Sequence, residues 1–350
     1  MQSLDPHQRP PEAIRNVYKK YQKMRLKDID QDLELIDLDG DLSAAKKAHV
    51  SMLREIDVER LATAFRAFAG QNLQSMHSVP VYEIEDIPGL QVIPSLVPPE
   101  VQRLLLTRLL HRDLSDPSHL TNIHTHYDVS YPRSNSSFFS QSPGSVEIAA
   151  QPLDPSIHRP ITVTQLLNRK MRWMTLGGQY DWTQKRYPSS PSPAFPLDIK
   201  QLLEGVFPAT KAEAAIVNLY SPGDTLSVHR DVAEECGKGL ISVSLGCDAI
   251  FVIGLSSDCL HQVDAESNAR LQPPEKTLAL RLRSGSAVYM SGESRFAWHG
   301  VPQIIPDTCP GYLRNWPNID DGDEFAEWKG WMANKRINLN VRQMTERSAK

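Results

Sequence analysis

The chain has 350 residues, of which 40% are hydrophobic, and its 38 Lys and Arg against 42 Asp and Glu give a formal net charge of −4. This composition is globular, the length suits one large domain or two modest ones, and no apolar run approaches the ~20 residues that a membrane span needs. Proteins that bind nucleic acid without specificity are normally basic, so any such contact here must use local patches.

The first residues, Met1 to His7, have no apolar signal core and contain an early acid. They predict neither a secretory signal nor a mitochondrial presequence, and we expect the protein in the nucleus, the cytoplasm or both. The four cysteines (236, 247, 259 and 309) lack Cys-x-x-Cys spacing, which favours reduced thiols inside a cell.

Residues 1–78 are predicted to be a polar N-terminal helical extension. Helices are expected from Pro10 through Arg25 and over Val58–Phe68, where the apolar spacing is amphipathic. A basic cluster in the first helix is typical of a solvated face, with contact to RNA or DNA as the alternative. The cluster comprises Lys19, Lys20, Lys23, Arg25 and Lys27.

Residues 79–211 begin with a predicted strand near Gly89–Pro94, followed by a helix over 99–112. The stretch 114–160 is dense in Ser, Pro and His and is predicted to be a long surface loop, either partly ordered or mobile.

Residues 212–346 are predicted to be rich in short strands, with an insertion loop at 255–276 and a helix over Glu324–Met332 that packs through Trp328 and Trp331. Such strands with turn punctuation predict a sandwich or jelly roll. The predicted strands are Ala214–Leu219, Leu240–Leu245, Ala249–Ile253, Thr277–Leu282, Ser286–Met290, Gly300–Ile305 and Arg336–Arg342.

A His-x-Asp pair at His229 and Asp231 predicts a metal site. Residues two apart on an extended segment point to the same side, and His299, after the strand-like run 286–290, provides a third ligand. Two histidines and one carboxylate leave open metal positions, as in non-haem Fe(II) oxygenases. Zinc hydrolases can use the same ligands, so the triad alone does not identify the metal.

Two other His-x-Asp pairs occur in the chain. His111 and Asp113 end a leucine-rich helical run, where positions two apart diverge by about 200°, so this pair is predicted to be a solvated helix end. His126 and Asp128 lie in the Ser- and Pro-rich stretch without a strand pattern, and binding of metal or substrate there is the lesser alternative.

The C-terminal strand alternates polar and apolar residues. Arg336, Asn338, Asn340 and Arg342 share one face, and the residues between them are apolar. Taken alone, this pattern is typical of a strand with one wet face. Beside an iron triad, it favours a guanidinium that binds the distal carboxylate of 2-oxoglutarate, because arginine offers planar bidentate recognition.

The chain resembles the AlkB family of Fe(II)/2-oxoglutarate dioxygenases, within the subgroup of the first eukaryotic AlkB homologue. The resemblance covers roughly 160–346 well, 80–160 weakly and little of the first 78 residues. It is carried by four ordered blocks: Leu-Gly-Gly-Gln-Tyr-Asp-Trp at 176–182, Asn-x-Tyr-x-x-x-Asp-x-x-x-x-His-x-Asp at 218–231, Met-Ser-Gly-Glu-Ser-Arg-x-x-x-His-Gly-Val at 290–301, and Arg-x-Asn-x-x-x-Arg-Gln at 336–343.

The resemblance implies an α+β fold with a double-stranded β-helix (jelly-roll) core flanked by helices. It also implies that Fe(II), 2-oxoglutarate and O2 are used. The implied metal ligands are His229, Asp231 and His299. The implied 2-oxoglutarate residues are Arg336, Asn218, Tyr220 and Asn338, with Arg342 near the iron-proximal part of the co-substrate and the substrate side.

A nucleotide-recognition lid near 172–190 is implied, in which Trp182 and Tyr187 would contact the substrate. Ordinary packing is the alternative for both aromatics, while Lys185 and Arg186 between them favour a loop that faces nucleic acid. Where the bacterial prototype has a second aspartate that contacts the base, this chain continues from Asp231 with Val-Ala-Glu, and the eukaryotic subgroup also lacks that aspartate.

The implied function is oxidative demethylation of a methylated base in RNA, with tRNA preferred, or in DNA. Hydroxylation of an N-methyl group would release formaldehyde, succinate and CO2, and the base must be unpaired or flipped to reach a buried iron. Local basic patches such as Arg169–Arg172 would assist binding. The same chemistry on a protein side chain is an alternative. A catalytically silent binding module is a third possibility, which the intact triad and both arginines disfavour.

Overall fold

The computed structural model describes residues 4–346 apart from 257–275, 319–323 and the short stretches 6, 41, 43–46, 48, 72, 74–75, 134–135, 183 and 189. The predicted insertion loop at 255–276 therefore lies almost entirely outside the described residues. Among the helices that are described, none is long and apolar enough to cross a membrane.

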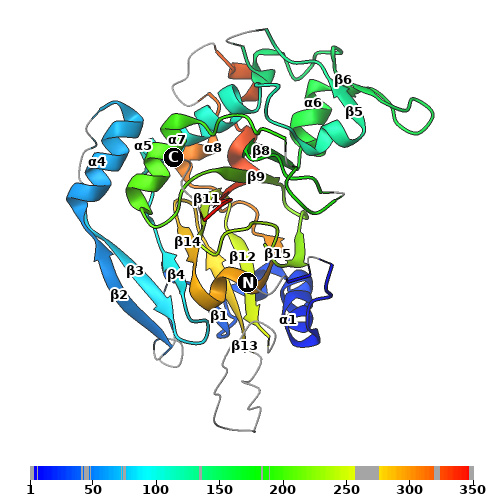
Figure 1. Cartoon of the computed structure of the whole chain (residues 1–350). Coiled ribbons are helices and arrows are strands. Elements are labelled where there is room, and N and C mark those ends of the chain that lie inside the picture. Colours follow the sequence, from blue (N-terminus) through cyan, green and yellow to red (C-terminus); the bar gives the residue numbers. More distant parts are fainter. Residues whose placement is uncertain are drawn as a thin grey trace.

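The core consists of two sheets that share one hydrophobic interior, which confirms the predicted jelly roll (Figure 1). The eight-stranded sheet has the order β2 (Val50–Ile56), β3 (Val79–Ile84), β4 (Leu90–Ile93), β14 (Ala287–Met290), β11 (Leu240–Gly246), β16 (Arg336–Arg342), β9 (Ala214–Tyr220) and β8 (Trp173–Gly177). The five-stranded sheet has the order β1 (Leu35–Ile36), β13 (Lys276–Leu282), β12 (Ala249–Leu255), β15 (Trp298–Ile304) and β10 (Leu226–His229). All seven strands predicted beyond residue 212 are present, with ends shifted by at most two residues.

Helix α1 (Glu12–Lys23) covers the outer face of the five-stranded sheet, at the lower right of Figure 1. Its Ile14 and Tyr21 form a small apolar cluster with residues of β12 and β15. The close approach requires a glycine in β12, because a Cβ at Gly254 would lie 2.8 Å from Ile14 Cγ1. The first predicted helix is thus confirmed, and its apolar stripe is used for docking.

The second predicted N-terminal helix is α4 (Val58–Ala69), which packs against α5 (Pro99–Thr107) and α7 (Leu197–Val206). The Asp57 side chain accepts from the backbone N–H groups of Glu59 and Arg60, which satisfies donors that an uncapped helix would leave free. Gly70 ends the helix with a φ of 72°. Three further α-helices are single turns: α2 (Leu26–Ile29), α6 (Val163–Gln165) and α8 (Gly311–Arg314).

Residues 1–78 are not only helical, contrary to the prediction. β1 pairs parallel with β13, and β2 pairs antiparallel with β3. The N-terminal segment therefore contributes a strand to each sheet of the core. The pattern was missed because β2 has five consecutive exposed residues and no strict alternation.

The stretch 114–160 is not a simple surface loop, which corrects a second prediction. It contributes η2 (Asn122–Thr125), η3 (Phe138–Ser140) and two strands of a small sheet, β5 (Tyr127–Val129) and β6 (Ile148–Pro152), which β7 (Ile161–Thr162) completes at the upper right of Figure 1. Strands of only two to five residues are too short to give a reliable periodic signal.

The predicted helix over Glu324–Met332 is wrong, because two 3₁₀ turns replace it: η7 (Ala326–Trp328) and η8 (Trp331–Asn334). Gly330 separates them with a φ of 88°, which interrupts a helix. The packing role predicted for Trp328 and Trp331 is confirmed, since both rings meet Phe139 edge-on.

The pair His111 and Asp113 is not a solvated helix end. Helix α5 continues as the π-helix η1 (Arg108–Asp113), in which Asp113 is buried and pairs with Arg112 at 2.6 Å. His111 stacks on Phe325 with ring centroids 4.3 Å apart. Trp316 and Phe325, both distant in the sequence, pack on His111 and cover this helix end, and helical periodicity cannot predict that contact. Among the described residues, η4 (Leu166–Lys170) is also a π-helix. The 3₁₀ helix η6 (Gly292–Phe296) precedes β15.

Candidate metal and co-substrate site

Two neighbouring strands bring the predicted metal ligands together. β10 and β15 are antiparallel, and His229 lies directly opposite His299, so both imidazoles are on one face with ring centroids 4.5 Å apart. Asp231 follows two residues later. Its Oδ1 lies 3.8 Å from His229 Nε2, and its Oδ2 lies 3.9 Å from His299 Nε2. One ligand atom from each residue falls within 4.8 Å of the other two, which is compatible with a single ion.

Backbone carbonyls fix the orientation of both imidazoles. Nδ1 of His229 is 2.9 Å from the Ser227 carbonyl oxygen, and Nδ1 of His299 is 3.0 Å from that of Ala297. A carbonyl can only accept, so each Nδ1 carries the proton and each Nε2 presents a lone pair towards Asp231. Burial, together with the neighbouring His229, lowers the pKa of His299 to about 4, which keeps this imidazole neutral at physiological pH.

The carboxylate of Asp231 is ionised at the same site. Burial alone would raise its pKa, but the Arg342 guanidinium holds that pKa well below its usual range. Arg342 Nη2 donates to Asp231 Oδ2 at 2.8 Å. Two neutral nitrogens and one carboxylate are the donor set of an open-faced Fe(II) centre, so the residues fit the metal.

A row of polar side chains crosses the middle of the eight-stranded sheet. Strand β16 lies between β9 and β11, and its register places Arg336 opposite Tyr220 and Asn338 opposite Asn218. On the other side, Ser244 lies opposite Asn338. Directly opposed residues share a face of the sheet. The four co-substrate residues predicted from the sequence are therefore gathered on one face of adjacent strands.

The Arg336 side chain is buried, and not all of its N–H donors have a hydrogen-bond partner among the described residues. Its Nη2 donates to Ser244 Oγ at 2.8 Å and its Nη1 to the Cys247 carbonyl at 3.4 Å. Within the described parts of the chain, its Nε and the Tyr220 hydroxyl have no hydrogen-bond partner. Burial lowers the pKa of Arg336 to about 10. Unsatisfied buried donors are unfavourable, and a carboxylate between these two groups would satisfy both, so Arg336 and Tyr220 fit one end of 2-oxoglutarate.

A cavity of about 460 Å³ opens beside the triad. Trp182, Lys185 and Tyr187 line it from the predicted lid, opposite His229 and Asp231. Trp182 is 39% exposed, and its ring contacts those of Trp173 and Tyr180 at centroid distances of 5.3 and 5.0 Å. The fourth predicted substrate residue, Arg186, is exposed and does not line the cavity. Its backbone forms an isolated antiparallel β-bridge with that of Asp181.

The pair His126 and Asp128 lies away from the triad. Asp128 is in β5, and the His126 ring is 4.8 Å from that of His158. Neither residue belongs to a cluster of metal-binding groups among the residues that the structure describes. The lesser alternative of a metal site at this pair therefore has no support.

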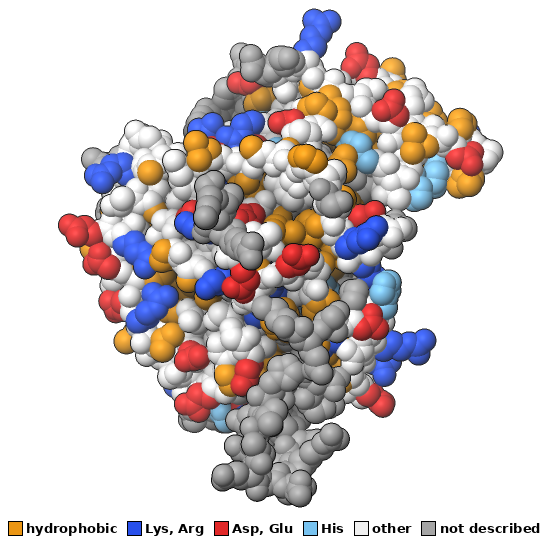
Figure 2. Space-filling view, in the orientation of Figure 1, with side chains coloured by type: hydrophobic (Ala, Val, Ile, Leu, Met, Phe, Trp, Pro, Cys, Tyr) orange, Lys and Arg blue, Asp and Glu red, His pale blue; other side chains and the backbone are white. Residues whose placement is uncertain are grey.

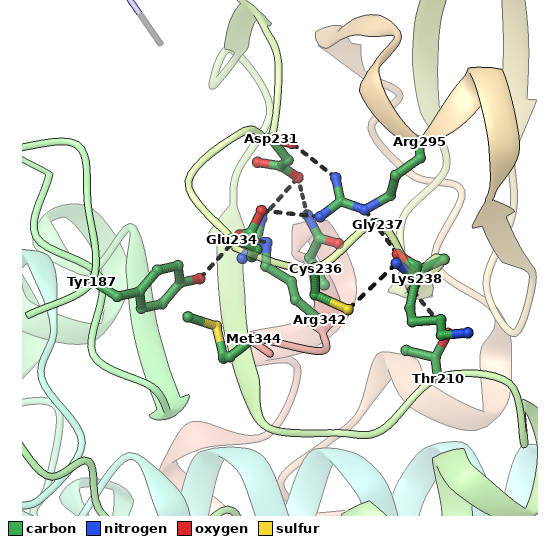
Figure 3. A network of polar contacts seen from close by, with 12 residues as sticks. Tyr187, Thr210, Asp231, Glu234, Cys236, Gly237, Lys238, Arg295, Arg342 and Met344 are labelled. Atoms are coloured by element: carbon green, nitrogen blue, oxygen red, sulfur yellow. Dashed lines mark hydrogen bonds and ion pairs between the residues drawn. The ribbon is translucent and has the colours of Figure 1, made fainter. Parts of the chain in front are cut away.

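Sequence reasoning missed several residues that shape the site. Ser244 contacts Arg336, Asn340 Nδ2 lies 3.4 Å from Asp231 Oδ2, and Glu234 and Arg295 are buried beside Arg342 (Figure 3). The serines of β11 could have been found, because Ser242 and Ser244 alternate with apolar residues. No local pattern distinguishes Glu234 from exposed charged residues. Arg295 belongs to the family block at 290–301, but that block alone does not show which groups it contacts.

Comparison with known proteins agrees with this geometry. The model of the 2OG-Fe(II) oxygenase superfamily matches residues 89–342. The chain is 44% identical to the N6-methyladenosine RNA demethylase ALKB1 of Pyricularia oryzae, over 98% of both chains. It is 41% identical to the tRNA demethylase abh1 of Schizosaccharomyces pombe, over 75% of this chain and 82% of that one.

A plant relative, the DNA N(6)-methyladenine demethylase ALKBH1A of Arabidopsis thaliana, is 35% identical over 51% of this chain and 50% of its own. The metal triad, the polar row on β16 and these relatives lead to one assignment. The chain belongs to the AlkB family of Fe(II)/2-oxoglutarate-dependent dioxygenases, in the subgroup of the first eukaryotic AlkB homologue.

Proposed function

We propose that this enzyme is an oxidative demethylase of N-methylated nucleobases in RNA or DNA. The observation that carries the proposal is the cavity beside the triad, which combines aromatic rings and a lysine with His229 and Asp231. Planar rings suit a base and a lysine suits a phosphate. The relatives named above are described as demethylases of RNA or DNA, which supports the same substrate class.

In this proposal, His229, His299 and Asp231 hold Fe(II). Arg336 and Tyr220 hold the distal carboxylate of 2-oxoglutarate, with Asn218 and Asn338 beside it and Arg342 towards the metal. When bound, iron, 2-oxoglutarate and O2 supply the oxidising power needed to hydroxylate a methyl group. A hydroxylated N-methyl group then loses formaldehyde, which leaves the unmodified base.

The residues of the chain determine what reaches the metal. His229 and Asp231 line the cavity and His299 is buried beside them, so a base stacked within a duplex cannot reach the triad. A flipped or unpaired base would stack on Trp182 and Tyr187, and Lys185 would accompany its phosphate. Arg186, which lies outside the cavity, would at most contact the flanking strand.

We favour RNA, and tRNA in particular, as the first substrate to test, because two relatives that are more than 40% identical over at least 75% of this chain are named for RNA. In this reading the enzyme takes part in tRNA modification, and action on DNA would instead indicate a role in DNA repair.

The test starts from protein loaded anaerobically with Fe(II) and 2-oxoglutarate. O2 is admitted, and nucleoside mass spectrometry follows the loss of methyl groups from total tRNA and from methylated single-stranded DNA. We expect demethylation that requires both Fe(II) and 2-oxoglutarate and that His229→Ala abolishes. Succinate formation without any nucleoside change, combined with oxidation of a histone or ribosomal peptide, would contradict the proposal and favour a protein substrate.

A further inference from the structure

Three ion pairs and one hydrogen bond to the backbone form a closed ring that passes through Asp231 (Figure 3). Arg342 Nη2 donates to Asp231 Oδ2 at 2.8 Å, and Arg342 Nε lies 3.0 Å from Glu234 Oε1. Arg295 Nη2 donates to the other oxygen of Glu234 at 3.0 Å, and Arg295 Nη1 donates to the backbone carbonyl of Asp231 at 2.8 Å. The ring therefore starts at the Asp231 side chain and returns to its main chain.

The ring is buried, which distinguishes it from a surface ion-pair network. The side chains of Arg295, Glu234 and Arg342 are 1–2% exposed, and that of Asp231 is 12% exposed. Two guanidinium groups balance two carboxylates. Buried ion pairs often stabilise a fold no more than apolar residues of the same volume, because desolvation opposes their attraction. A contribution to stability is therefore a weak explanation for the ring.

The ring holds a segment that has no regular structure. β10 ends at His229 and β11 begins at Leu240, so Asp231 and Glu234 lie in an irregular connection. His229 is fixed by its pairing with β15, whereas Asp231 has no strand partner. Arg295 bonds the Asp231 carbonyl, the Glu234 side chain and, at 2.9 Å, the Lys238 carbonyl. One guanidinium thus anchors three points of the connection.

The substrate-facing wall contacts the same ring. Tyr187 lines the cavity opposite the triad, and its hydroxyl donates to Glu234 Oε1 at 3.3 Å. Figure 3 shows Tyr187 pointing at Glu234 from the side opposite Arg295. Both oxygens of Glu234 are therefore engaged within the protein, and Glu234 is not available to read a base in the way that the second aspartate of the bacterial prototype does.

We propose that Glu234 and Arg295 are positioning residues for the oxidation reaction. They fix Arg342 and the main chain of Asp231, and so would hold the Asp231 carboxylate, whose Oδ2 accepts from Arg342, in place as a metal ligand. The hydroxyl of Tyr187 joins the substrate-facing wall to this ring. The inference rests on the proposed role of Asp231 as a metal ligand and is independent of the substrate.

The experiment removes both charges of the buried pair together. In Glu234→Leu/Arg295→Met no unpaired charge remains, so the fold is expected to survive. Anaerobic titration with Fe(II), and with Co(II) as a spectroscopic probe, measures metal affinity and ligand geometry, and thermal unfolding checks the fold. We expect the Kd for Fe(II) to rise about 10–100-fold, the usual effect of losing the partners of a metal ligand, and the Co(II) spectrum at saturation to change.

The control is Arg283→Met/Asp37→Leu, which removes a more exposed ion pair with N–O distances of 3.1 and 2.5 Å beside the five-stranded sheet. Its metal affinity and Co(II) spectrum should equal those of the wild type. A folded Glu234→Leu/Arg295→Met variant with wild-type Fe(II) affinity and an unchanged Co(II) spectrum would overturn the inference. A wild-type protein that binds Fe(II) but demethylates no nucleic acid would overturn the proposed function and leave this test intact.

Tyr187→Phe tests the connection to the substrate-facing wall, since it removes one hydroxyl and retains the ring. We expect a smaller rise in the Fe(II) Kd, roughly five-fold, as for the loss of one hydrogen bond. Tyr131→Phe is the control, because its hydroxyl bonds His124 at 3.0 Å in the small-sheet region. Equal Fe(II) affinity in Tyr187→Phe and the wild type would remove Tyr187 from the ring.

Discussion

The two arginines at the ends of β16 are both buried, yet their electrostatic environments are opposite. Arg342 has Asp231 and Glu234 within 3.0 Å, and these carboxylates, with Tyr187, raise its pKa although burial alone would lower it. Arg336 has no carboxylate within 4.0 Å among the described residues, and burial lowers its pKa. A guanidinium whose charge is already balanced positions other groups of the protein. One whose charge is unbalanced is prepared to bind an anion.

The roles of both arginines depend on a metal held by the triad, and His229→Ala tests that metal site with the largest expected effect. We expect loss of Fe(II)-dependent succinate formation, because two remaining ligands cannot hold iron well in an open site. The fold should persist, since the His229 side chain is 31% exposed. His126→Ala, at the unused His-x-Asp pair, is the control and should keep its turnover. Wild-type succinate formation by His229→Ala would refute the ligand assignment.

The next largest effect is a difference in the free energy of unfolding between variants of the two arginines. Arg342→Met leaves two buried carboxylates with only Arg295 as a cation, and we expect a loss of about 3–5 kcal/mol in the free energy of unfolding. Arg336→Met removes a buried guanidinium that lacks a counter-ion and should be nearly neutral. Denaturant unfolding of both proteins without 2-oxoglutarate measures the difference. Equal destabilisation by the two substitutions would break the comparison.

For 2-oxoglutarate affinity, we expect the substitution of Arg336 to have the larger effect. Arg336→Met should weaken binding by about 2–5 kcal/mol, as for other truncated charge pairs. Isothermal titration with 2-oxoglutarate under anaerobic conditions measures this loss directly. The wild type should also gain thermal stability from 2-oxoglutarate, because a ligand that binds only the native state stabilises it, and Arg336→Met should not. An unaltered affinity would transfer the carboxylate-binding role to another residue.

The smallest expected effect is that of removing the Tyr220 hydroxyl. Tyr220→Phe removes a buried hydroxyl that has no partner among the described residues, so the free energy of unfolding should change little without ligand. Binding of 2-oxoglutarate should weaken by about 1 kcal/mol, the usual contribution of one hydrogen bond. The same titration detects it. Loss of stability without loss of 2-oxoglutarate affinity would show that the hydroxyl serves packing alone.

The parts of the fold that were predictable are those with local patterns. The seven strands beyond residue 212 and helices α1 and α4 follow from alternation or from helical spacing. The small sheet of β5, β6 and β7, and the strands that residues 1–78 add to both sheets, were missed. Their strands are short or lack alternation, and only pairing with distant segments makes them strands.

The predictable parts of the site are likewise those with a local sequence pattern. The alternation of Arg336, Asn338, Asn340 and Arg342 and the spacing of His229 and Asp231 are local, so residue patterns and family resemblance were sufficient to predict which residues meet. The different states of the two arginines were not predictable. Both belong to one strand and one face, and what separates them is the presence of Glu234 and Asp231 beside only one of them.

Residue type and short-range spacing were sufficient to predict the family, the donor set and the strand that carries both arginines. Long-range packing was needed to show that Arg295, 64 residues from Asp231 along the chain, bonds its carbonyl, and that Tyr187 reaches Glu234 across the cavity. The reason is physical: charged residues are usually solvated, and whether one is instead buried and paired depends on which distant segments pack around it.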